Sequence, residues 1–80
     1  MGYEPLKPIQ CRMARAGLRL GVRDLAKRTR VSPTTITRLE RGEALMPYTI
    51  ADIRAALEKA GAIFEDETIF SSVSITPRFK

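Results

Sequence analysis

The chain has 80 residues, a formal net charge of +5 and no histidine. Its length allows one small domain, with too little core for a two-lobed enzyme cleft. Without histidine there is no Ser–His or Cys–His pair, and Cys11 has no second thiol for an intrachain disulfide. We therefore expect no catalytic residues, no metal site and no cofactor. Cys11 is expected to be a packed small side chain rather than a redox switch.

No run of the roughly 20 apolar residues that a membrane span needs occurs in the sequence, and the first residues do not have the pattern of a signal peptide. The expectation is therefore a cytoplasmic protein with no membrane partner. A reducing compartment also suits the single cysteine.

Start and stop signals predict the first two helices. Pro8 opens the first and Gly17 ends it, with Ile9, Met13 and Ala16 at helical spacing on one face. The second starts after a Gly21 cap, with Asp24 placed to complement the helix dipole and with Leu25 and Ala26 turned inward. The expected helices span residues 8–16 and 22–29.

Two further helices follow. Ser32 and Pro33 are a hydroxyl cap and a first-turn proline, and Gly42 ends this third helix, with Ile36 and Leu39 facing inward. Pro47 opens the fourth helix and Gly61 stops it. Within it, Ile50, Ile53 and Leu57 follow one another at spacings of three and four residues. Thr49 and Asp52 mark an alternative, later start.

The tail after Gly61 has strand character. Residues 72–76 alternate polar and apolar side chains, and residues 62–65 are expected to form a second short strand, with Asp66 in or beside the turn of a hairpin. A lone hairpin is marginal in water, so this one must pack on the helices or on a second copy of the chain. We expect two units, a helical one at residues 1–61 and a β extension at residues 62–80 that dimerises through Ile63, Phe64, Phe70, Val73 and Ile75.

Charge is concentrated in the front half. Residues 7–41 carry ten basic and two acidic side chains, whereas residues 42–80 carry four basic and six acidic ones. This asymmetry indicates a phosphate-facing front half, although solvated helix faces are the alternative.

Two short helices joined by a tight turn, the second with a basic outer face, indicate a helix-turn-helix. The run DLAKRTRVSPTTITRLERG at residues 24–42, and above all VSxxTIxRLERG at residues 31–42, closely resembles the phage-repressor and Cro-type helix-turn-helix family, also called the XRE family. The resemblance implies a mainly α fold: a compact DNA-binding domain of four to five helices, here followed by a short β-hairpin or strand.

The same resemblance implies DNA contacts from Ser32, Pro33, Thr34, Thr37 and Arg38. Arg38 is the strongest candidate for reading a guanine, because a guanidinium fork matches the O6 and N7 atoms of that base. Arg23 and Arg41 resemble phosphate-holding residues, with plain solvation as the alternative. Arg15 and Glu40 occupy positions that form an ion pair in several relatives. The alternative for Arg15 is a solvated stripe with Arg12 and Arg19.

The sequence departs from the family pattern at two places. Gly21 and Val22 stand where relatives commonly have Ser-Gln, so a contact that buttresses the recognition helix is missing. Thr29 and Arg30 stand where the turn usually has Ala-Gly, and a left-handed Arg30 would be strained.

The leading interpretation is a sequence-specific DNA-binding regulator: a nucleoid-associated repressor that binds a palindromic operator on double-stranded DNA as a homodimer. The alternative is a protein-binding module on the same scaffold, such as the antitoxin partner of a small toxin or a coactivator-like bridge.

Overall fold

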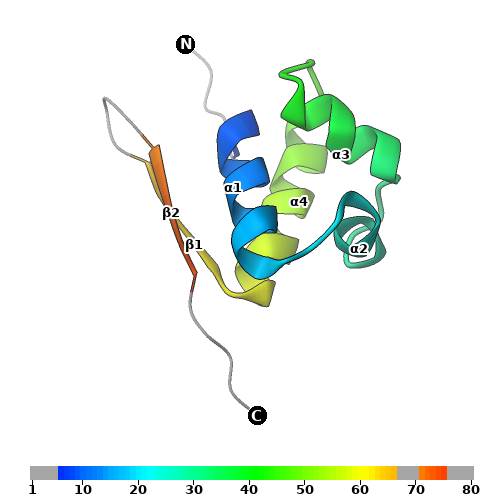
Figure 1. Cartoon of the computed structure of the whole chain (residues 1–80). Helices are drawn as coiled ribbons and strands as arrows, with labels where there is room; N and C mark the ends of the chain where they lie inside the picture. The colour runs from blue at the N-terminus through cyan, green and yellow to red at the C-terminus, as the bar shows by residue number, and fades with distance from the viewer. Residues whose placement is uncertain (1–5, 67–70, 76–80) are drawn as a thin grey trace.

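The computed structural model describes residues 6–66 and 71–75, where four helices precede a two-stranded hairpin (Figure 1). This confirms the mainly helical fold with a β extension that the sequence predicts. The helices are α1 (Pro8–Leu18), α2 (Val22–Lys27), α3 (Pro33–Glu40) and α4 (Pro47–Ala60), and the strands are β1 (Ala62–Asp66) and β2 (Ser71–Ile75).

The core lies between the four helices and is built from small and medium aliphatic side chains. Leu25 of α2, Ile36 of α3, and Ile53 and Leu57 of α4 are fully buried there. The inward positions predicted for α2 and α3 are confirmed, and Ile50 of α4 packs on the core edge. Burial of each such side chain contributes about 1.5–3 kcal/mol, so these contacts hold the helices together.

Helix α1 is longer than predicted. It continues through Gly17 to Leu18 and stops at Arg19, which adopts the left-handed conformation with φ 59°. The amide of Arg19 donates to the Ala16 carbonyl at 3.2 Å, and the amide of Leu20 donates to the Arg15 carbonyl at 2.9 Å. The expectation that Gly17 ends the helix is therefore wrong, because Leu18 and Leu20 pack against the core and hold the two additional residues in place.

The inward face of α1 is also not the apolar stripe seen in the sequence. Ile9 and Met13 are 49% and 42% exposed, whereas Gln10 and Cys11 are buried. Gln10 is tolerated inside because its Oε1 accepts a hydrogen bond of 2.8 Å from the Lys7 backbone amide at the start of the helix. The apolar stripe of α1 therefore faces outward.

The turn between α2 and α3 is built by Thr29. Helix α2 ends at Lys27, two residues earlier than expected, and the Thr29 hydroxyl donates to the Ala26 carbonyl at 3.0 Å. The same hydroxyl accepts from the Val31 amide at 3.1 Å. Arg30 is not left-handed, since Arg19 is the only non-glycine residue with positive φ in the described chain. The threonine side chain supports the turn without that strain.

The remaining helix ends follow their sequence signals. The Thr35 amide donates to the Ser32 hydroxyl at 3.2 Å, which makes Ser32 the N-cap of α3. Helix α4 begins at Pro47 rather than at the later alternative, and Gly61 follows its last residue with φ 123°.

The hairpin packs against the helices. Its strands are antiparallel, with Ala62 opposite Ile75 and Asp66 opposite Ser71, so Asp66 is the last residue of β1. Ala62 is buried, and a Cβ added to Gly17 of α1 would lie 2.8 Å from Cγ1 of Ile75. Gly17 thus lies against the end of β2, and Figure 1 shows the hairpin beside α1.

Candidate nucleic-acid interface

Helix α3 presents one buried and one exposed face. Ile36 and Leu39 are 0% and 3% exposed and fasten the helix to the core. Its Ser32 cap and first-turn proline fix where the helix starts, and the opposite face is open to solvent. The exposed residues on and beside α3 that the sequence singled out are Ser32, Pro33, Thr34, Arg38 and Arg41.

Thr37 differs from its neighbours, because it is only half-exposed. Its hydroxyl donates to the Pro33 carbonyl at 3.2 Å within the same helix. With that donor engaged, the methyl group is the part of Thr37 suited to an apolar contact, such as one with a thymine methyl.

A hollow of about 490 Å³ lies between α2 and the start of α3. Its lining includes Arg23 and Lys27 of α2 together with Pro33 and Thr34 of α3. Two cations next to a helix N-terminus suit a phosphate group. Sequence reasoning selected Arg23 but missed Lys27, although the spacing of four places both on one side of α2.

Glu43 is a second residue that the sequence analysis did not select. Its Oε1 accepts a hydrogen bond of 2.9 Å from Nε of Arg38, and its Oε2 lies 3.7 Å from Nη1 of Arg41. Its position directly after the glycine that ends α3 was the available signal, because the chain folds back over the helix end there.

The arrangement of α2, turn and α3 has a counterpart among known families. A family model described as a helix-turn-helix domain matches residues 10–68. The chain belongs to this helix-turn-helix family. The family is typical of XRE-like DNA-binding regulators, which agrees with the resemblance of residues 24–42 to the XRE family. Domains of this family are in general non-enzymatic. A search of curated proteins found no match to the chain.

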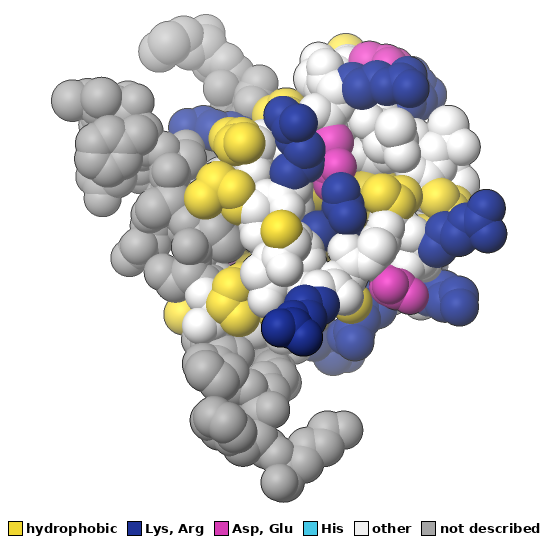
Figure 2. Space-filling model, viewed as in Figure 1, with side chains coloured by type: hydrophobic (Ala, Val, Ile, Leu, Met, Phe, Trp, Pro, Cys, Tyr) yellow, Lys and Arg dark blue, Asp and Glu magenta, His cyan; other side chains and the backbone are white. Residues whose placement is uncertain are grey.

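The helix-turn-helix domain therefore indicates a DNA-binding regulator. No helix in the described part of the chain combines the length and the apolar character needed to cross a lipid bilayer. Dark blue Lys and Arg side chains lie over the α2 and α3 side of the domain and also over α1, while yellow hydrophobic ones gather over α1 beside the hairpin (Figure 2).

Beneath the exposed face of this helix-turn-helix domain, Arg15 and Glu40 join α1 to α3. Nε of Arg15 donates to Glu40 Oε2 at 2.7 Å and its Nη2 donates to Oε1 at 2.8 Å, while its Nη1 donates to the Leu20 carbonyl at 3.1 Å. Cys11 adds a third donor, with Sγ 3.2 Å from Glu40 Oε2. Glu40 of α3 thus accepts hydrogen bonds from two residues that are four positions apart on α1.

The same contacts shift the pKa values of Cys11, Arg15 and Glu40. Burial raises the pKa of the Cys11 thiol, and the hydrogen bond to Glu40 adds to the rise, so the thiolate form is disfavoured. The hydrogen bond to Glu40 raises the pKa of Arg15. Partial burial raises the pKa of Glu40, but the hydrogen bonds from Arg15 and Cys11 and the nearby positive charges outweigh it, leaving that pKa below its ordinary value.

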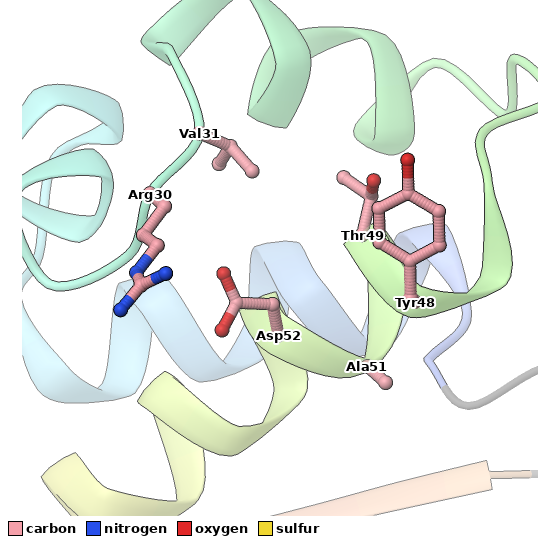
Figure 3. Close-up of a pocket in the computed structure, with 6 residues that line it drawn as sticks. All are labelled: Arg30, Val31, Tyr48, Thr49, Ala51 and Asp52. Carbon is pink, nitrogen blue, oxygen red and sulfur yellow. The ribbon is translucent and has the colours of Figure 1, made fainter.

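A second hollow, of about 760 Å³, lies between the turn of the helix-turn-helix and the start of α4 (Figure 3). Arg30 approaches it from the turn, and Tyr48, Thr49 and Asp52 approach it from α4. Tyr48 is 70% exposed. The hollow carries both signs of charge, so it is less suited to a phosphate than the hollow beside Arg23.

The hairpin residues proposed for dimerisation separate into different environments. Ile63 is 48% exposed, whereas Phe64 and Ile75 are partly buried against the core. The guanidinium carbon of Arg54 lies 5.0 Å from the centre of the Phe64 ring. Val73 is paired with Phe64 in the strand register, and Phe70 lies outside the described residues. Among the three whose side chains the structure describes, Ile63 is the exposed one.

Proposed function

We propose that this helix-turn-helix domain is a sequence-specific transcriptional repressor that acts in the cytoplasm, on the nucleoid, as a homodimer on a palindromic operator. The observation that carries the proposal is the α3 surface: a helix fixed at both ends and fastened by Ile36 and Leu39, with Thr34 and Arg38 exposed. A helix that projects such side chains into the major groove reads base edges.

Each exposed residue has a role in this proposal. Arg38 reads a guanine, and Thr34 and Thr37 contact neighbouring bases. Arg23, Lys27 and Arg41 hold phosphates and set the register without reading sequence. Ser32 and Pro33 form the start of α3, which faces the sugar–phosphate backbone of the DNA.

The homodimer is supported by apolar side chains that the fold leaves exposed. Ile9 and Met13 on α1 and Ile63 on β1 are all more than 40% exposed, and α1 and β1 are in contact with each other. Two copies joined through this region would present two α3 helices to half-sites about 34 Å apart, one turn of DNA.

The test is capture and sequencing of genomic fragments bound by the purified protein, at near-physiological salt with excess nonspecific competitor. We expect recovery of an inverted repeat. The Arg38→Ala and Thr34→Ala variants should lose affinity for the recovered repeat, while Lys59→Ala, which removes a charge from the far end of α4, should retain most of it.

Binding that is blind to sequence would contradict the proposal. In that case, copurification of a second chain with the protein would favour a protein-binding role, such as that of an antitoxin bound to a small toxin.

A further inference from the structure

We propose that Glu43 is a positioning residue that sets the base preference of Arg38 by holding its guanidinium with both terminal nitrogens turned toward a guanine. This inference rests on the proposed function, because it takes α3 to be the base-reading helix. It adds a specificity determinant that lies outside that helix.

The backbone fixes Glu43 over the end of α3. Gly42 has φ 85°, its amide donates to the Leu39 carbonyl at 2.9 Å, and the Glu43 amide donates to the Arg38 carbonyl at 3.0 Å. This pair of bonds is the Schellman motif, in which the residue after the glycine commonly makes an apolar contact with the helix. Here that residue is a glutamate, and its partner is Arg38. The backbone therefore places the start of the Glu43 side chain beside Arg38.

The ion pair with Glu43 uses Nε of Arg38, whereas base reading would use its two terminal nitrogens. Glu43 engages Nε of Arg38 at 2.9 Å, so this contact does not occupy Nη1 and Nη2. An arginine that reads guanine end-on needs two parallel donors for the O6 and N7 atoms of the base. Side-chain exposures of 48% and 40% mean that the pair adds little stability. Its effect is to bias the guanidinium toward one orientation.

Glu43 also affects binding that does not depend on sequence. Its second carboxylate oxygen lies 3.7 Å from Nη1 of Arg41, so one negative charge sits between two arginines of the same surface. A negative charge there opposes phosphate attraction, which dominates nonspecific affinity. Glu43 should therefore weaken nonspecific binding while it sharpens guanine recognition.

The experiment selects binding sites from a randomised duplex library with the full chain. Arg38→Ala first identifies the base pair at which guanine preference depends on Arg38. Glu43→Leu and Glu43→Gln are then compared at that base pair. Leucine removes the acceptor and suits the apolar contact of the motif, so the fold is retained. Glutamine keeps an acceptor oxygen at the same distance but removes the charge.

The expected result for Glu43→Leu is a loss of guanine preference of about two- to fivefold at this base pair, the range that an exposed ion pair can supply. Glu43→Gln should keep most of the preference. Both variants should bind a nonspecific duplex more tightly than the unmodified chain. The matched control is Glu58→Leu, which removes a similar pair between Nε of Arg54 and Glu58 at 3.2 Å on α4 and should leave guanine preference unchanged.

An unchanged preference in Glu43→Leu would overturn the inference alone. So would an equal loss in Glu43→Gln, because charge rather than position would then be responsible. If the unmodified chain selects no sequence from the library, the proposed function itself fails.

Discussion

Arg19 carries the one left-handed non-glycine backbone in the described chain, with φ 59°. An L-residue in this conformation costs about 1 kcal/mol relative to glycine, because its Cβ approaches the following carbonyl. The side chain is exposed, so its packing does not compensate that cost locally. The chain tolerates the strain because Leu18 and Leu20, on either side of Arg19, both pack on the core.

Replacing Arg19 with glycine should therefore stabilise the protein. We expect Arg19→Gly to raise the free energy of unfolding by about 0.5–1 kcal/mol, measured by urea denaturation monitored by circular dichroism. Ala55→Gly, in the exposed middle of α4, is the matched control and should lower it by about 1 kcal/mol. A destabilised Arg19→Gly variant would show that the guanidinium makes a contact that offsets the backbone cost.

Glu40 is the other residue at which a local change should have a large effect. Its side chain is 9% exposed and its two carboxylate oxygens accept bonds from Arg15 and Cys11. Glu40→Gln leaves the Arg15 guanidinium partly buried without a counter-charge. We expect a loss of about 2 kcal/mol in the free energy of unfolding at neutral pH. The matched control Glu58→Gln changes a side chain that is 47% exposed and should cost less than about 0.5 kcal/mol.

The pH dependence follows from the lowered pKa of Glu40. In the unfolded chain the carboxyl titrates near its ordinary value of 4.5, and in the folded chain it titrates below that value. The stabilisation is therefore complete above about pH 4.5 and disappears as the pH falls through the lower, folded pKa. Unfolding curves should show the gap between Glu40→Gln and the unmodified chain narrowing as the pH falls below 4.5. A gap that stays constant down to strongly acidic pH would contradict this assignment.

At the scale of elements, α3 could be predicted almost completely and α1 could not. The two ends of α3 carry local signals, a serine–proline start and a glycine stop, and both act within a few residues of themselves. The end and the inward face of α1 depend instead on what packs against it. Gln10 is tolerated inside because its amide oxygen caps the helix, and α1 continues past Gly17 because Leu18 and Leu20 pack on the core.

The contact between Gly17 and Ile75 gives a test of how the hairpin is attached. A side chain at Gly17 would enter the space of Ile75, since its Cβ alone would lie 2.8 Å from Cγ1. We expect Gly17→Leu to displace β2, with hydrogen exchange of the hairpin amides accelerated at least tenfold while far-ultraviolet circular dichroism keeps the helical signal. Ala16→Leu, one residue earlier on the exposed side of α1, should leave hairpin exchange unchanged. Equal exchange in both variants would argue against this attachment.

At the scale of the whole molecule, the basic helical surface is proposed to bind DNA and the exposed apolar side chains are proposed to join two copies of the chain. Arg23 and Lys27 line the hollow beside α3, whereas Ile9, Met13 and Ile63 belong to α1 and β1. Because Phe64 and Ile75 pack on the chain's own core, the hairpin has one face committed to this protomer. A second copy is therefore expected to meet the side that carries Ile63.

The dimer prediction is best tested by a surface substitution. Removing residues 62–80 should yield a monomer with poor operator affinity, but it also removes the buried Ala62. Ile63→Ser avoids this cost and should weaken the dimer at least tenfold in sedimentation equilibrium, with DNA affinity falling in parallel. Ala55→Ser, on the exposed side of α4, is the control. If Ile63→Ser left the dimer unaffected, the interface would not lie on this face of the hairpin.

The sequence by itself determined the helix-turn-helix, the caps of α3, the inward residues of α2 and α3, and the strand character of the tail. These features arise from local backbone preferences and from periodicity, which act over a few residues. The sequence also drew attention to Arg15 and Glu40, but only by resemblance.

Only the tertiary structure decided which face of α1 is buried, where α1 ends, which hairpin side chains pack inward, and that Glu43 pairs with Arg38. Burial depends on which surfaces meet, and an ion pair depends on where two side chains are held in space. Neither burial nor such an ion pair can be deduced from the spacing of residues along one helix.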